Sequence, residues 1–342
     1  MAASISIFGA GSWGTALAIH LAEKGRNITL WARRGEAVEQ MRRTRRNPTY
    51  LSDVDIPSSV DITSDVETAA AATSLWAMVV PSQNLRSVAA RLGPHTRTGV
   101  TVVSLAKGIE NDTLQTMSQV LADELSDLSR QQIGVLYGPS HAEEVAEGRP
   151  TTVVAAAPTE SRAEWIQDAF MTDRLRVYVN TDVVGVEIGG SAKNVLAVAA
   201  GISDGVGYGD NAKAALVTRG LAEMRRLGLA LGADPQTFAG LAGIGDLLVT
   251  CMSTHSRNRY FGEQIGKGRS LDEIEAEMDM VAEGVRTTQS IRDLARHHGI
   301  EMPITEAVYA VLFEGDQPDD RVDDLMTRPA KREHWLPNTL RA

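Results

Sequence analysis

One lysine stands in the middle of a stretch that is otherwise apolar and rich in small residues. The stretch is EIGGSAKNVLAVAAGISDG, residues 187–205, and the lysine is Lys193. On a helix, its neighbours three and four positions away include no carboxylate: they are Gly189, Gly190, Leu196 and Ala197. A buried ammonium must find a distant partner or give up its proton, because desolvation lowers the pKa of a lysine. Many helical lysines instead reach water along their own stem, and this segment alone leaves both possibilities open.

A second isolated charge offers a partner for this lysine. The stretch GLAGIGDLLVTC, residues 240–251, sets Asp246 among apolar residues, with Thr250 one turn further along if the segment is helical. A buried aspartate needs a cation, as a buried lysine needs an anion. Pairing Lys193 with Asp246 would satisfy both charges.

The tripeptide SRN supplies three different hydrogen-bond donors in succession. Ser256 offers a hydroxyl, Arg257 a guanidinium and Asn258 an amide, a set suited to a phosphate monoester. Ser256 would also be a good helix cap, and the sequence does not choose between these roles.

Two further loops carry polar groups directly after predicted strands. SLAKGIE places Lys107 after one strand, and LYGPSHAEEV places Gly138 and Ser140 after another. In open parallel sheets the ligand crevice lies at the carboxyl ends of the strands, so both loops should face a bound cofactor. A lysine on a surface loop is the alternative for Lys107.

The N-terminus carries a glycine-rich loop. SISIFGAGSWGTALAIHLAEKG reads as a strand, then Gly9, Gly11 and Gly14 in GxGxxG spacing, then a helix, and the strand NITLWA follows. The spacing alone could be accidental. In this strand-loop-helix-strand setting, the first glycine permits a tight turn, the second the approach of a pyrophosphate, and the third close packing of helix on strand. The sequence therefore predicts a dinucleotide-binding site.

The end of the second strand bears on the choice of coenzyme. An NAD-selective site usually has an acid there to hold the ribose hydroxyls, about 20 residues after the glycines. This strand ends WARRG instead, with Arg33 and Arg34. Arginines can pair with a 2′-phosphate, which favours NADPH or dual use of NADP and NAD. The alternative is a solvated basic face, as the run MRRTRRNPTY shortly afterwards suggests.

The elements that must position these residues fall into two groups. The strand candidates are SISIF, NITLWA, LWAMVV, TVVSLA, IGVLYG, TTVVAAA and LRVYVN, and they alternate with helical patterns. This alternation predicts a mostly parallel sheet in an α/β Rossmann-type N-terminal domain, residues 1–184. Beyond Asp182 the spacing is helical, which predicts an all-α domain over residues 185–342. A cleft between the two domains would be the default ligand site.

Composition excludes several classes of protein. The 342 residues are 43% hydrophobic and 23% charged, with a formal charge of -10, which argues against general affinity for nucleic acid or anionic membranes. The single cysteine excludes an internal disulfide framework, and no CxxC or HExxH spacing indicates a metal site. No signal peptide or run of about 18 strongly apolar residues is evident. We expect a cytoplasmic protein without membrane insertion.

Several longer strings closely resemble one family. GAGSWGTALA, KGIE, GPSHAEEV, SAKNVLAVAAGISDGVGYGDNAKAALVTRG, TFAGLAGIGDLLVTC, SRNRYFG and VAEGVRT occur in the order found in bacterial NAD(P)-dependent glycerol-3-phosphate dehydrogenase. The resemblance implies reversible hydride transfer between NAD(P)H and dihydroxyacetone phosphate, giving sn-glycerol 3-phosphate for phospholipid synthesis. It also implies a C-terminal domain like that of 6-phosphogluconate dehydrogenase, and a homodimer.

The resemblance also implies roles for the residues above. Lys193 would donate a proton to the ketone in reduction and accept it in oxidation, oriented by Asn194 and Asp246 with Thr250 nearby, while Lys107 would polarise the substrate oxygen. Both lysines and Asp246 would touch the substrate, and its phosphate would be held by Arg257 and Asn258 in a site lined by Gly138, Ser140 and Ser256. The residues around the cofactor would be Gly9, Gly11, Ser12, Trp13, Gly14, Arg33, Arg34, Tyr50, Lys107, Ala142, Arg257, Val281 and Glu283.

One position departs from the family pattern, since His141 follows GPS where phenylalanine is common. The adjacent His297 and His298 match no motif and are interpreted as surface residues. The sequence leaves two rival functions open. A β-hydroxyacid or 6-phosphogluconate type dehydrogenase would share the fold and the lysine-asparagine pair, but SRN and AGIGD favour glycerol phosphate. A non-catalytic NADP sensor would not need every lysine and phosphate donor intact.

Overall fold

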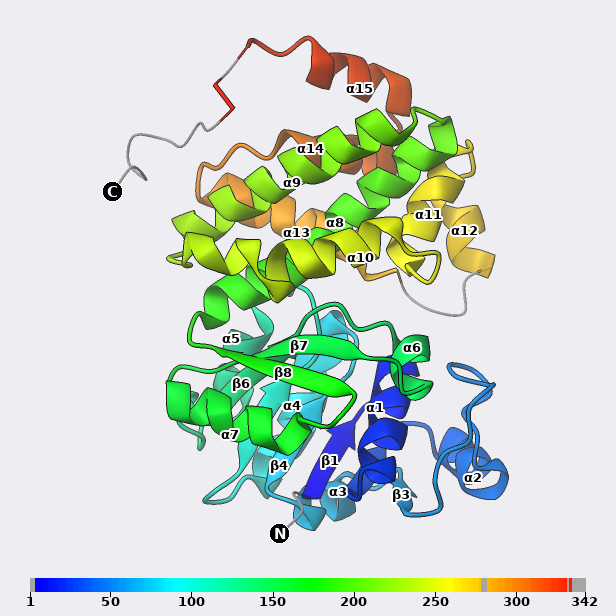
Figure 1. Cartoon of the computed structure of the whole chain (residues 1–342), viewed down its shortest axis with the longest axis vertical. Coiled ribbons are helices and arrows are strands. Elements are labelled where there is room, and N and C mark those ends of the chain that lie inside the picture. The colour runs from blue at the N-terminus through cyan, green and yellow to red at the C-terminus, as the bar shows by residue number, and fades with distance from the viewer. Residues whose placement is uncertain (1–3, 278–281, 331, 334–342) are drawn as a thin grey trace. The chain divides into compact units, whose positions relative to one another are not determined.

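The computed structural model describes residues 4–277, 282–330 and 332–333 (Figure 1). The chain forms two compact units: one comprises Met1–Lys107 and Gln115–Val183, and the other comprises Gly108–Leu114 and Val184–Ala342. The short segment Gly108–Leu114 therefore folds with the C-terminal half of the chain. The assignment of residues 1–184 and 185–342 as functional domains stays a prediction.

The first unit is built on an eight-stranded sheet of order β3-β2-β1-β4-β5-β6-β7-β8. Neighbouring strands are parallel except β6 and β7, which are antiparallel. The first six strands follow the order of a Rossmann-type sheet, which confirms the predicted fold class. The strands are β1 (Ser4–Phe8), β2 (Asn27–Trp31), β3 (Val60–Thr63), β4 (Leu75–Met78), β5 (Thr101–Ser104), β6 (Ile133–Tyr137), β7 (Thr151–Ala156) and β8 (Leu175–Asn180).

All seven predicted strands are present, and the sequence analysis missed one. The missed strand is β3, a four-residue strand at the edge of the sheet. Only Val60 and Ile62 give it an apolar alternation, which is too short to stand out from a loop.

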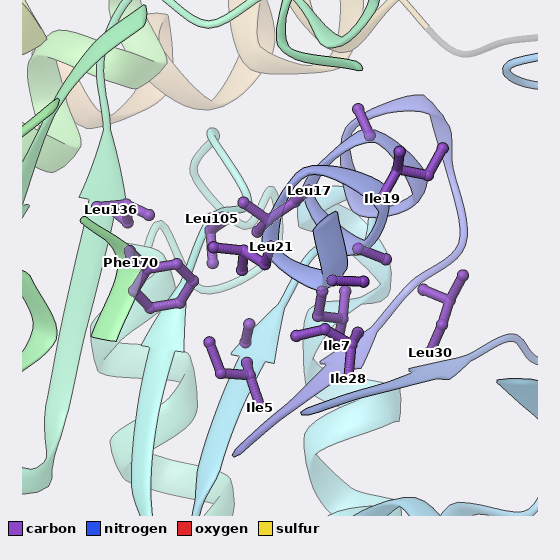
Figure 2. Packing of buried hydrophobic residues seen from close by; sticks show 14 of the residues in the cluster. Ile5, Ile7, Leu17, Ile19, Leu21, Ile28, Leu30, Leu105, Leu136 and Phe170 are labelled. Carbon is purple, nitrogen blue, oxygen red and sulfur yellow. The ribbon is translucent and has the colours of Figure 1, made fainter. Parts of the chain in front are cut away.

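Helices cover both faces of this sheet. They are α1 (Ser12–Glu23), α2 (Gly35–Thr44), α3 (Val66–Ala72), α4 (Leu85–Leu92), α5 (Met117–Glu124), α6 (Ala142–Ala146) and α7 (Glu160–Phe170). Because side chains alternate across a strand, Ile5 and Ile7 of β1 pack with α1, whereas Phe8 packs on the other face with residues of α3 and α4. Figure 2 shows the first of these clusters, in which Leu17 and Leu21 of α1 lie near Ile7.

Within the described residues, the second unit contains helices and loops and lacks strands, as predicted. The α-helices are α8 (Val183–Val206), α9 (Asp210–Ala230), α10 (Asp246–Met252), α11 (Arg257–Gly266), α12 (Leu271–Glu277), α13 (Glu283–His297), α14 (Pro303–Tyr309) and α15 (Pro318–Met326). Every residue from Gly185 to Ser203 is buried, so α8 is the central helix of this unit. By length and composition α8 could cross a membrane, but 89% of its most apolar window is buried inside the protein, as in a core helix.

A buried carboxylate joins two helices of this unit. Glu223 of α9 accepts hydrogen bonds from the backbone N–H groups of Ile304 and Thr305, at 2.7 and 3.2 Å, in the first turn of α14. Arg226, one turn along α9, donates from Nη2 to the carbonyl oxygen of Glu301 at 3.0 Å. Burial raises the pKa of Glu223 to about 7.

Candidate active site

The glycine loop lies between β1 and α1, and its backbone geometry requires glycine. Gly9 has φ +125°, which side chains rarely adopt, and a Cβ atom there would overlap the backbone of Val79. A Cβ atom on Gly14 would overlap the carbonyl oxygen of Gly9. By contrast, a Cβ atom on Gly11 would meet nothing within 4 Å. The loop is thus packed tightly on its inner side, while the space beside Gly11 is open.

This geometry fits a dinucleotide. Gly11 is the N-cap of α1, and it has no side chain to bond the N–H groups of the first turn. Those N–H groups and the positive end of the helix dipole suit a pyrophosphate, and the open space at Gly11 lets it approach the backbone.

A residue that the sequence analysis overlooked holds the loop in place. Asn47 is 4% exposed, and its Nδ2 donates to the carbonyl oxygen of Ala10 at 2.9 Å and to Oγ1 of Thr15 at 2.8 Å. Ser12 Oγ similarly donates to the carbonyl oxygen of Tyr50 at 2.9 Å. The segment 47–50 therefore braces the glycine loop. Asn47 lies within a basic run whose arginines are mostly exposed, so nothing in the local pattern singles it out.

The predicted groups after β5 and β6 lie together. Lys107 Nζ donates to the carbonyl oxygen of Gly138 at 2.9 Å, and Ser140 Oγ donates to the same oxygen at 3.0 Å. The Lys107 ammonium also lies 5.8 Å from the ring centre of Tyr137. Since β5 and β6 are parallel neighbours, their carboxyl ends meet at one edge of the sheet. Lys107 is half-buried and tied to this edge, unlike a solvated surface lysine.

In the second unit, Lys193 is buried and paired with Asp246. The lysine is 6% exposed and the aspartate 1% exposed, and the Nζ atom donates to Asp246 Oδ1. Nζ also donates to Thr250 Oγ1 at 2.8 Å, and that hydroxyl donates to the carbonyl oxygen of Asp246 at 2.6 Å. The predicted ion pair is therefore present, and two oxygen acceptors fix the direction of the ammonium.

The ion pair depends on the close approach of two backbones. A Cβ atom on Gly189 would overlap the carbonyl oxygen of Ala242. Gly189 lies one turn before Lys193, and Ala242 lies four residues before Asp246 in a π-helical turn, Leu241–Gly245, that leads into α10. This contact brings α8 and α10 near enough for the two side chains to meet.

Asn258 links the lysine's neighbour to another helix. Its Nδ2 donates to Asn194 Oδ1 at 3.0 Å, and its Oδ1 accepts from the backbone N–H of Gly284 at 2.9 Å. Gly284 is the second residue of α13, so Asn258 satisfies one backbone N–H group of that helix's first turn. Asn194 and Asn258 are therefore connected, and Glu283, expected at the cofactor, precedes Gly284 as the first residue of α13.

The structure gives Ser256 the role of a helix cap. Its Oγ accepts from the backbone N–H of Arg259 at 3.2 Å at the start of α11. Arg257, the first residue of α11, is exposed, whereas Asn258 is buried. A role for Ser256 at a substrate phosphate stays a prediction, as does that of Arg257.

The one cysteine of the chain lies beside the ion pair. Cys251 follows Thr250 in α10 and is fully buried. Burial raises the pKa of its thiol to about 12, so the thiol is neutral near pH 7 and unsuited to act as a nucleophile.

The remaining predicted residues differ in their surroundings. Arg33 and Arg34 are exposed, and they lie between β2 and α2. His297 and His298 are both exposed, which confirms their interpretation as surface residues. Of the other positions expected at the cofactor or beside it, Trp13, Tyr50 and His141 are half-buried, Ala142 is buried at the start of α6, and Val281 lies outside the described residues.

Comparison with known proteins decides the family. Residues 4–163 match the profile of the NAD-dependent glycerol-3-phosphate dehydrogenase N-terminus, and residues 182–323 match that of its C-terminus. The chain belongs to the NAD(P)+-dependent glycerol-3-phosphate dehydrogenase family. It is accordingly an oxidoreductase that depends on NAD(P)+.

Individual members of the family match over nearly their whole length. A glycerol-3-phosphate dehydrogenase [NAD(P)+] of Salinibacter ruber is 79% identical over 100% of this chain and 99% of that protein. One from Chlorobium phaeobacteroides is 53% identical over 96% of this chain and 98% of that protein. The crystal structure of glycerol-3-phosphate dehydrogenase from Coxiella burnetii has a TM-score of 0.91 at 38% identity, covering 96% of this chain and 99% of that one.

Proposed function

We propose that this family member interconverts dihydroxyacetone phosphate and sn-glycerol 3-phosphate, with Lys193 as the acid/base group. The product would supply phospholipid synthesis. The observation that carries the proposal is the buried Lys193 ammonium, held by Asp246 and Thr250. Burying an ion pair costs desolvation free energy, so such pairs are uncommon in protein cores. A lysine whose ammonium has a fixed direction is suited to deliver a proton to one atom.

The chain's own residues would manage the charge that develops in the reaction. The nicotinamide cofactor, when bound, supplies the hydride. As negative charge grows on the ketone oxygen, Lys193 would donate a proton from Nζ, and Lys107 would stabilise the charge electrostatically. Thr250 and Asp246 would keep the ammonium aimed, and Asp246 would compensate the lysine's buried charge.

The substrate phosphate would be bound by Arg257 and Asn258. These residues form the first turn of α11, a ten-residue helix whose N-terminus favours an anion. A guanidinium adds charge-assisted hydrogen bonds. Since Asn258 already bonds Asn194 and Gly284, it would also fix the phosphate relative to Lys193.

The coenzyme preference would depend on Arg33 and Arg34. Both side chains are exposed just after β2, where a dinucleotide's ribose is held in this fold. Two guanidinium groups there suit a 2′-phosphate, so we expect NADPH to be preferred to NADH.

The experiment that tests the function is a set of initial rates. NADPH and NADH oxidation are each measured with dihydroxyacetone phosphate and with unphosphorylated dihydroxyacetone. Fast oxidation only with the phosphate ester supports the proposal. Measurable coenzyme binding without turnover of dihydroxyacetone phosphate would show that the proposed substrate is wrong. A β-hydroxyacid dehydrogenase or a non-catalytic sensor would then be the favoured function.

The same assay tests the coenzyme preference. The double variant Arg33→Ala/Arg34→Ala should raise the KM for NADPH about tenfold or more while changing the KM for NADH little, because charge-assisted contacts to the 2′-phosphate are lost. Arg43→Ala, at an exposed position of α2, is the matched control. Equal changes in the KM for NADPH and the KM for NADH would show that the two arginines do not bind the 2′-phosphate.

A further inference from the structure

A second arginine in the SRNRYFG motif faces the protein instead of solvent. Arg259 lies two residues after Arg257, but its side chain is only 14% exposed. Its Nη1 donates to Asp204 Oδ2 at 2.7 Å, its Nε donates to the carbonyl oxygen of Ser253 at 3.1 Å, and Nη1 lies 3.2 Å from Glu263 Oε2. The guanidinium is thus engaged by acceptors of the protein itself.

The principal acceptor, Asp204, belongs to the helix that carries the lysine. Asp204 lies eleven residues after Lys193 in α8, three turns further along nearly the same face. Its Oδ2 also accepts from Lys213 Nζ of α9 at 2.7 Å, and its side chain is 24% exposed. Two cations therefore fix the carboxylate, and the group differs from an exposed surface ion pair, which contributes little.

The backbones of α8 and α11 touch where this ion pair forms. A Cβ atom on Gly201 would overlap the carbonyl oxygen of Arg259, and a Cβ atom on Gly262 would overlap that of Val198. Each contact joins a glycine of one helix to a backbone carbonyl of the other, so it sets how closely the two helices approach. The directional, charge-assisted bond from Arg259 to Asp204 adds a constraint on the register of the two helices.

The bond from Arg259 to Ser253 reaches a third element. Ser253 is the C-cap of α10, the helix that carries Asp246 and Thr250, and its carbonyl oxygen also accepts from the backbone N–H of Ser256 at 3.2 Å. Arg259, itself in the first turn of α11, is therefore bonded to α8 and to the end of α10. These are the elements that carry Lys193, its partners and the proposed phosphate donors.

We infer that Arg259 and Asp204 are positioning residues that fix Arg257 and Asn258 in register with Lys193. They hold the phosphate end of the substrate at a set distance from the proton donor without touching the substrate. This inference rests on the proposed function, because it assumes that Arg257 and Asn258 bind the phosphate.

The test compares Arg259→Ala, Asp204→Ala and the double variant by steady-state kinetics. Each single variant should raise the KM for dihydroxyacetone phosphate about tenfold, with the KM for NADPH unchanged and kcat reduced less. The double variant should be little worse than either, because both changes remove one shared contact. Lys24→Ala removes an ion pair of the first unit, Lys24 with Asp173 at 2.8 Å, and should leave the kinetics unchanged.

Two conservative variants guard against loss of folding. Asp204→Asn keeps the volume of the side chain. Arg259→Lys keeps the positive charge but replaces the two nitrogens that bond Asp204 and Ser253, Nη1 and Nε, by a single one. Both should fold, with Arg259→Lys recovering part of the lost affinity for substrate. If thermal stability falls in these variants while the substrate KM stays at the wild-type value, the two residues are merely structural and the inference is wrong.

Arg257→Ala separates this inference from the proposed function. A raised substrate KM in Arg257→Ala, with a normal KM in Arg259→Ala and Asp204→Ala, overturns the positioning role and leaves the phosphate site intact. A normal KM in Arg257→Ala overturns the phosphate site, and the inference falls with it.

Discussion

At the scale of residues, the proposed chemistry would depend on a few buried polar groups. Lys193 and Asp246 are both nearly fully buried, and each would be prohibitively costly without the other. Thr250 completes the group, because its hydroxyl both accepts from the lysine and donates to the backbone of Asp246. Two of the three N–H bonds of the Lys193 ammonium point at Asp246 and Thr250, and this also sets the direction of the third.

Removing the Lys193 ammonium tests its role directly. In Lys193→Ala, kcat should fall by a factor on the order of 10² or more, because no group would then donate the proton. NADPH affinity, measured by fluorescence titration, should stay near the wild-type value. The variant removes the cation that pairs with the buried Asp246, so the free energy of unfolding should also fall, by about 3–5 kcal/mol.

A primary amine provides the control for that variant. Methylamine should restore part of the lost turnover if the missing group is a proton donor of that size. Near-normal turnover in Lys193→Ala would exclude the lysine from the proton transfer.

At the scale of elements, the second unit uses buried charge to join its helices. Glu223 of α9 binds two N–H groups at the start of α14, a helix end that would otherwise leave them unsatisfied. Burial raises the pKa of Glu223 to about 7 from an ordinary value of 4.5. A carboxyl group whose pKa is raised by folding contributes most to the free energy of unfolding at a pH where it is protonated in both the folded and the unfolded state.

The sign of the pH dependence follows from this pKa. Below pH 4.5 Glu223 makes its full contribution to the free energy of unfolding. This contribution is lost as the pH rises through about 7, because the Glu223 carboxyl group ionises more readily in the unfolded state than in the folded state. Relative to Glu223→Gln, the wild-type free energy of unfolding should therefore fall by up to about 3 kcal/mol across this window.

Denaturant titrations of both proteins at a series of pH values measure this difference. Glu36→Gln, at an exposed position of α2, controls for the loss of one negative charge. If the wild-type and Glu223→Gln curves run parallel between pH 4.5 and 7, the assignment of this pH dependence to Glu223 is wrong.

At the scale of the whole molecule, the chain does not divide at a single point. Gly108–Leu114 follows β5 in sequence but packs in the helical unit. Ile109 is fully buried in the hydrophobic cluster of that unit, and Asn111 Nδ2 donates to Gln289 Oε1 of α13 at 3.2 Å. A short segment from the first half of the sequence is thus part of the core of the second unit.

Ile109→Ala should therefore weaken the helical unit, although residue 109 lies in the first third of the sequence. Loss of the buried side chain should cost about 2–5 kcal/mol. Hydrogen exchange should become faster in α8 and α13 and stay unchanged in β1 and α1. Ile7→Ala, in buried β1, should show the reverse pattern, because Ile7 packs with α1. Faster exchange in β1 for the Ile109 variant would contradict the assignment of this segment.

The sequence alone determined the Rossmann-type sheet, the all-helical second half and the family. Strand and helix patterns are local, so the alternation of SISIF, NITLWA and later strands was sufficient, and only the short β3 lacked a distinguishing pattern. It also singled out Lys193 and Asp246, because an isolated charge in an apolar stretch needs a partner.

The tertiary structure decided which of these residues meet and what else holds them. The contact of Gly189 with Ala242, the bonds from Asn47 to the glycine loop and the group formed by Arg259 with Asp204 join positions 32–55 residues apart. Such contacts leave no local pattern, since a buried asparagine or arginine looks like a solvated one until the chain has folded around it. The sequence identified the groups that could do chemistry, and the packing of helices decided where they are held.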